Sequence, residues 1–153
     1  MKTVLAVIGV GLVFVYVIGS GAWVNTGDNW YRSLNQPSWQ PPDFIFGIIW
    51  PYNFIVLGFA AVIVSQRLSA ALVSAYLSIF ALSVAAALTW AYQFYRPHNL
   101  EAASTALTCV AVLTIALVVI ASRASWPLAF ALMPYQVWVS IASVLSWGYA
   151  RAN

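Results

Sequence analysis

Five long apolar segments, each about the length of a membrane-spanning helix, dominate this sequence. They cover residues 3–24, 44–65, 70–95, 102–121 and 127–150, and no Asp, Glu, Lys or Arg interrupts any of them. About 20 apolar residues cross the hydrocarbon core of a bilayer. Because lipid offers the backbone no hydrogen-bond partner, each segment must form a helix. The sequence therefore predicts an all-α integral membrane protein, with residues 1–153 forming one five-transmembrane-helix bundle.

Composition excludes several other classes of protein. Hydrophobic residues make up 63% of the chain and charged residues only 6%, against roughly 25% charged residues in soluble domains. The net charge of +3 comes from scattered basic residues, so the chain lacks the basic face that nucleic-acid binding requires. With one cysteine, Cys109, and one histidine, His98, we expect no metal site. We expect Cys109 to be a buried, unreactive thiol.

The basic residues do not decide the orientation of the bundle. They divide equally between the two membrane sides, with Lys2, Arg67 and Arg123 against Arg32, Arg96 and Arg151. The positive-inside rule therefore gives a tie. No ionisable residue lies inside a span, which argues against a proton- or ion-coupled carrier. No nucleophile motif or phosphate-binding loop indicates an enzyme.

The connections differ greatly in length. Three of them are short, so we expect successive helices there to be antiparallel neighbours. The connection over residues 25–43 is the only one long enough to cover a face of the bundle. Its prolines limit the entropy lost on ordering it, and we expect it to form a lid. Trp30 and Trp39 are predicted to pack over the mouth of the bundle beneath it.

Small residues recur at four-residue spacing in the third segment, at Ala71, Ala75, Ser83 and Ala87. This spacing lets helix backbones approach closely in lipid. Two interpretations remain open, which are packing within the bundle and a homodimer seam along this helix.

Aromatic and small side chains fall at helical spacing in three of the spans. Trp50 precedes Phe54 by four residues, Trp90 precedes Phe94 by four, and Trp138 is four before Ala142. Residues three or four apart share one helix face. These faces either pack the core or enclose a slot for a flat apolar ligand with a few placed polar groups.

Two polar residues favour the interpretation that these faces enclose a ligand slot. Asn53 is costly inside a span unless it lines a pocket or packs internally. Arg32, in the long connection, has three possible kinds of partner, which are an acidic group on a ligand, Asp28 or Asp43, or a lipid headgroup.

Two blocks of sequence resemble a known family. The pattern W-Y-x-x-L-x-x-P-x-W-x-P-P covers residues 30–42 and is followed by Phe46 and Trp50, and P-Y-x-x-W-x-x-x-A-x-x-L covers residues 134–145. Both resemble the signature of the translocator protein family, also called tryptophan-rich sensory proteins or peripheral-type benzodiazepine receptors. With five spans, the resemblance extends over essentially the whole chain.

The resemblance implies a five-helix bundle, commonly a homodimer, whose first loop closes a pocket. Members bind porphyrins such as protoporphyrin IX, animal members bind cholesterol, and bacterial members are linked to tetrapyrrole regulation. It implies a porphyrin-binding receptor in a bacterial cell membrane, with the porphyrin as ligand and no required cofactor. Two alternatives remain, which are light-dependent porphyrin breakdown through Trp50 and Trp138, and transport of porphyrin or lipid.

The expected ligand-binding residues come from the long connection and three of the spans. They are Trp30, Arg32, Trp39, Phe46, Trp50, Asn53, Phe54, Ala87, Trp90, Phe94, Tyr135, Trp138, Ala142 and Leu145. By the resemblance, Trp50 and Trp138 flank the pocket. Ala87 and Ser146 stand where the family often has Asn, so two amide groups are missing from the expected pocket.

Overall fold

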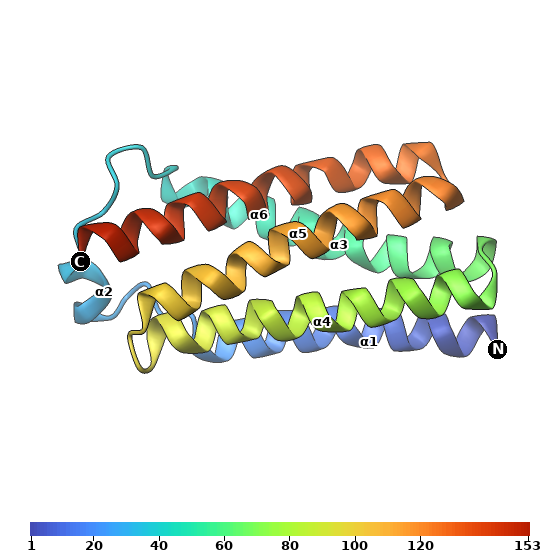
Figure 1. The fold of residues 1–153 in the computed structure, drawn as a ribbon, viewed down its shortest axis with the longest axis horizontal. Coiled ribbons are helices and arrows are strands. Elements are labelled where there is room, and N and C mark those ends of the chain that lie inside the picture. Colours follow the sequence, from blue (N-terminus) through green and yellow to red (C-terminus); the bar gives the residue numbers. More distant parts are fainter.

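The computed structural model describes residues 1–153 as a bundle of six helices (Figure 1). They are α1 (Lys2–Trp23), α2 (Asn29–Ser33), α3 (Asp43–Arg67), α4 (Ala70–Tyr95), α5 (Leu100–Ala124) and α6 (Trp126–Ala152). All except α2 are long and apolar enough to cross a membrane. The predicted all-α membrane protein with five spanning helices is confirmed.

Capping residues set where several helices begin, and they explain why α5 and α6 begin one or two residues before the predicted apolar segments. The side chains of Ser69, Asn99 and Ser125 accept hydrogen bonds from backbone N–H groups in the first turns of α4, α5 and α6. Such caps satisfy donors that have no partner inside the helix. The same rule explains α2, a short helix within the predicted loop, whose first turn is capped by Asp28.

The five long helices form a closed ring in the order α1, α4, α5, α6, α3, with each packed against the next. As expected, α4 packs closely against α5, and α5 packs closely against α6. The link of Leu68 and Ser69 joins α3 to α4, yet α3 packs chiefly against α1 and α6. A short link brings two helix ends together but does not dictate contact along their length.

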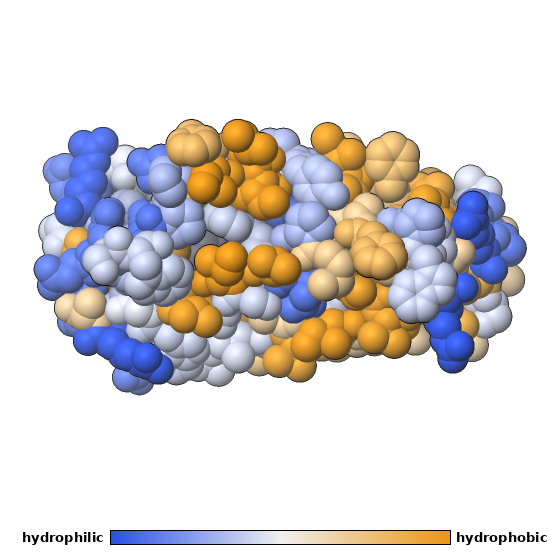
Figure 2. Space-filling view, turned by 90° about the horizontal axis from the view of Figure 1, so that it is seen from above, coloured by the Kyte–Doolittle hydropathy of each residue, from blue (hydrophilic) through white to orange (hydrophobic).

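The outer surface matches a membrane environment. Figure 2 shows apolar side chains over the middle of the molecule and hydrophilic ones gathered at both ends. Cys109 is exposed on this outer surface, so the expectation of a buried thiol is wrong. In lipid, the outward face of a helix is as apolar as its inward face, and hydropathy therefore does not tell which way Cys109 faces.

The small residues of α4 divide between two environments. Ser83 and Ala87 are buried within the bundle, whereas Ala71 and Ala75 are exposed. Ser83 and Ala87 therefore pack within the bundle. A homodimer seam along α4 stays a prediction.

Candidate functional site

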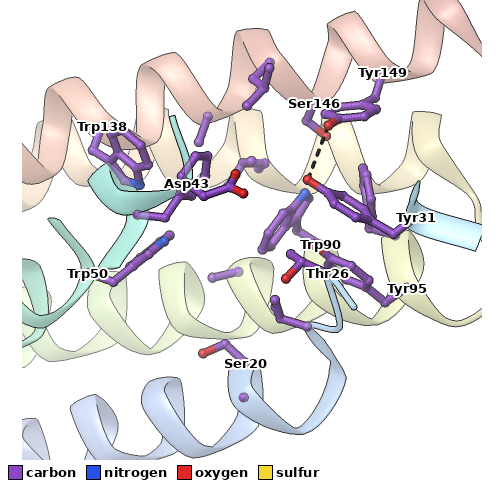
Figure 3. Close-up of a pocket in the computed structure, with 18 of the residues that line it drawn as sticks. Ser20, Thr26, Tyr31, Asp43, Trp50, Trp90, Tyr95, Trp138, Ser146 and Tyr149 are labelled. Atoms are coloured by element: carbon purple, nitrogen blue, oxygen red, sulfur yellow. Dashed lines mark hydrogen bonds between the residues drawn. The ribbon is translucent and has the colours of Figure 1, made fainter. Parts of the chain in front are cut away.

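A cavity of about 800 Å³ lies inside the bundle, at the end covered by α2 (Figure 3). All six helices contribute to its wall, and 16 of the 25 lining residues are hydrophobic. Both the volume and the mostly apolar wall are typical of sites that bind small molecules.

One face of α3 forms a continuous wall of this cavity. Asp43, Phe46, Trp50 and Phe54 all line it, and their spacing of three, four and four residues places them on one helix face. The rings of Trp50 and Phe54 stack with centroids 5.5 Å apart. Phe46 packs edge-on against Trp138 of α6, at a centroid distance of 5.0 Å. The walls from α3 and α6 therefore meet through aromatic contacts.

The walls from α4 and α6 carry hydrogen-bond donors without protein partners. Trp90 and Trp138 line the cavity, and the Nε1 atom of each is buried with no hydrogen-bond acceptor. A buried donor left without a partner costs about 1–3 kcal/mol. The two indoles of the cavity wall therefore each keep an unsatisfied N–H group in this structure.

Residues 25–42, including α2, form a lid that is fastened to the end of α6. The Asn35 backbone N–H donates to Asn153 Oδ1 at 2.8 Å, and Asn35 Nδ2 donates to the Ala152 carbonyl at 3.1 Å. The Tyr149 hydroxyl donates to Gln40 Oε1. Pro37 lies against Gly148 so closely that an added Cβ there would be 2.8 Å from Pro37 Cγ. The predicted loop thus does cover one end of the bundle.

Most of the residues predicted from the sequence surround this one cavity. Those that line it are Arg32, Phe46, Trp50, Phe54, Ala87, Trp90, Phe94, Trp138, Ala142 and Leu145. Ala87 and Ser146, the positions where the family often has Asn, both line it. A role in ligand binding stays a prediction for each of these residues.

Four predicted residues do not line the cavity. Trp30 stacks on His98, with ring centroids 3.6 Å apart, and contacts Phe94 edge-on. Trp39, itself part of the lid, is 49% exposed and does not line the cavity. Asn53 and Tyr135 are both 0% exposed inside the bundle. The Tyr135 hydroxyl donates to the hydroxyl of Tyr16, a cavity residue, at 3.3 Å.

Other cavity residues were not predicted from the sequence. Tyr31, Tyr95 and Tyr149 gather at the lid end, and Asp43 points into the cavity from the start of α3 (Figure 3). Helical spacing could have predicted Asp43, because it precedes Phe46 by three residues and Trp50 by seven and so lies on the same helix face. No comparable signal exists for Gln40, since the backbone between α2 and α3 is irregular.

Comparison with known proteins places the whole chain in one family. The family model described as TspO/MBR family matches residues 4–151. The membrane protein YtaB of Bacillus subtilis (strain 168) is 27% identical, across 100% of this chain and 99% of its own length.

Two further relatives carry the family's familiar names. The tryptophan-rich sensory protein of Cereibacter sphaeroides is 26% identical, across 93% of this chain and 91% of its own length. The translocator protein of Homo sapiens is also 26% identical, across 89% of this chain and 82% of its own length. The match extends over nearly all residues of the bundle and its lid, and this chain therefore belongs to the TspO/MBR family of membrane proteins.

Proposed function

We propose that this protein is a membrane receptor whose cavity binds porphyrins, such as protoporphyrin IX, and similar flat apolar ligands. The observation that carries the proposal is the set of indole rings around one cavity, with Trp50 on α3, Trp90 on α4 and Trp138 on α6. Flat conjugated ligands gain from stacked and edge-on contacts with such rings beyond simple area burial.

The polar groups of the cavity suit the edge of such a ligand. The Nε1 atoms of Trp90 and Trp138 are buried without an acceptor, and a shift of either indole that uncovers its N–H would offer a donor to the ligand. Arg32 lines the cavity from the lid, and a guanidinium pairs well with a carboxylate, often through two hydrogen bonds. The ring would then occupy the aromatic part of the cavity, with an acidic group directed toward the lid.

Titration of the purified protein with protoporphyrin IX tests this proposal. We expect saturable quenching of Trp fluorescence together with a shift of the porphyrin Soret band. Trp138→Ala should weaken binding at least about tenfold, because it removes a large buried contact. Trp126→Ala is the matched control, since Trp126 is 69% exposed and lies outside the cavity. Absence of saturable binding, or equal weakening in both variants, would contradict the proposal.

A second candidate function is light-dependent porphyrin breakdown. It is favoured by a chain of oxidisable side chains leading from the cavity into the core. Trp50 contacts the ring of Tyr16 at a centroid distance of 6.0 Å, and the Tyr16 hydroxyl accepts a hydrogen bond from Tyr135. Illumination of the porphyrin complex in air should bleach the Soret band, and Trp50→Phe should slow the bleaching. Equal bleaching rates in both proteins would reject this candidate.

A further inference from the structure

We propose that Asp43 sets the charge selectivity of the cavity. Its carboxylate excludes acidic groups from the wall formed by α3 and favours ligands that present a cationic or N–H donor group there. The proposal rests on the proposed ligand-binding function of the same cavity, and it names the class of ligand more narrowly. The favoured ligand is flat and amphoteric, with an acidic group toward Arg32 and a donor or cationic group toward Asp43.

The position of Asp43 follows from its helix. It is the first residue of α3, and it shares a helix face with Phe46 and Trp50, which both line the cavity. Figure 3 shows its carboxylate pointing into the cavity. A negative charge therefore lies on the same wall as the rings on which a flat ligand would stack.

The contacts that close the lid use other groups. They run through Asn35 and Asn153, and through Gln40 and Tyr149. The Asp43 carboxylate is therefore available to a ligand. A carboxylate in the first turn also stabilises a helix through the helix dipole. That role affects stability, whereas a selectivity role affects which ligands bind, and the two can be measured separately.

Arg32 gives the cavity a second, opposite charge. It lies on α2 next to Tyr31, whose hydroxyl contacts Tyr149 at the lid end of the cavity. Arg32 and Asp43 are both exposed at the lid end, so each charge acts only modestly on a ligand charge a few ångströms away. A ligand carboxylate is consequently attracted toward α2 and repelled from the start of α3, which gives the bound ligand one preferred orientation.

Three porphyrins with the same ring and different charge test the proposal. They are protoporphyrin IX with two carboxylates, its neutral dimethyl ester, and a derivative whose carboxylates are converted to amides bearing trimethylammonium groups. Relative to wild type, Asp43→Asn should bind protoporphyrin IX about fivefold more tightly and the cationic derivative about fivefold more weakly, as expected on removing one nearby charge. The dimethyl ester should change by less than about twofold, because it carries no net charge for Asp43 to act on.

Two further variants sharpen the result. Arg32→Gln should weaken binding of protoporphyrin IX and leave the dimethyl ester nearly unchanged. Asp28→Asn is the matched control, because Asp28 caps α2 and does not line the cavity, and it should leave the affinity ratios as in wild type.

The outcomes separate the two proposals. If none of the three porphyrins binds the wild-type protein, the proposed function fails, and the selectivity fails with it. If all bind, but wild type and Asp43→Asn show the same affinity ratios, only the selectivity proposal is overturned. A lower melting temperature of Asp43→Asn with unchanged ratios identifies the carboxylate as a helix-stabilising group alone.

Discussion

The hydroxyl groups of Tyr31 and Tyr149 lie 3.3 Å apart, which joins the short helix α2 directly to the end of α6. Tyr149 also donates to Gln40, on the other side of the lid. One hydroxyl therefore holds two separate parts of the lid. Because the cavity lies beneath these contacts, we expect them to slow the release of a bound ligand.

Tyr149→Phe should therefore loosen the lid while keeping the ring packing of α6. The substitution removes two hydrogen bonds, and a net contribution of about 1 kcal/mol for each predicts up to roughly thirtyfold faster dissociation of a bound porphyrin. Stopped-flow displacement measures this rate, and hydrogen exchange of residues 31–40 should rise in parallel. Tyr92→Phe, on a tyrosine outside the lid contacts, is the control. Identical dissociation from both variants would show that the Tyr149 hydroxyl does not hold the lid.

Gly9→Ala should destabilise the bundle by separating α1 from α3. An added Cβ would lie 2.6 Å from the Cβ of Ala61 and 3.1 Å from Cδ2 of Leu77. Overpacking of this kind typically costs about 1–3 kcal/mol, and the melting temperature in detergent should fall by several degrees.

Gly11→Ala provides the matched control on the same helix. A Cβ at Gly11 would meet nothing within 4 Å, and alanine is the better helix former. Its melting temperature should be equal to or above that of wild type. If the melting temperature of Gly11→Ala fell as much as that of Gly9→Ala, the cause would be helix propensity or lipid contact and not overpacking.

Thr108→Val should weaken the contact between α5 and α6. The Thr108 hydroxyl lies 2.8 Å from Ser143 Oγ and accepts a hydrogen bond from Trp147 Nε1 at 3.0 Å. Hydrogen bonds between helices in membranes average about 0.6 kcal/mol, so we expect a loss of roughly 1 kcal/mol in unfolding free energy. Thr105→Val removes only a bond to the Glu101 carbonyl of its own helix and should cost less. Equal losses would argue against the interhelical role.

Ala142→Phe should abolish ligand binding by filling the cavity. Ala142 lines it beside Trp138, and a phenyl group there would occupy space needed by a flat ring. Affinity for protoporphyrin IX should fall at least about tenfold, in line with the loss of a central contact. Val137→Phe, at a 51% exposed position of the same helix, should bind normally. Unchanged binding in Ala142→Phe would place the ligand elsewhere.

Much of the wall of the cavity was predictable from helical spacing alone. Residues 46, 50 and 54 recur at intervals that fix one face of a helix whatever the tertiary structure. The same reasoning would have added Asp43, which lies one turn earlier on that face. Spacing alone also placed Tyr135 in the cavity wall, because it lies three residues before Trp138 on the same helix. The structure shows instead that Tyr135 is buried in the core, whereas Trp138 lines the cavity.

The sequence by itself determined that this chain crosses a membrane through five helices, because runs of apolar residues without charges have no other stable arrangement in lipid. Which face of each helix points inward was decided by the tertiary structure, since the lipid-facing side of a helix is as apolar as its core side. Cys109 is the clearest case. The attachment of the lid through Asn35, Gln40 and Tyr149 was decided there too, because hydrogen bonds between residues more than 100 positions apart leave no periodic trace in the sequence.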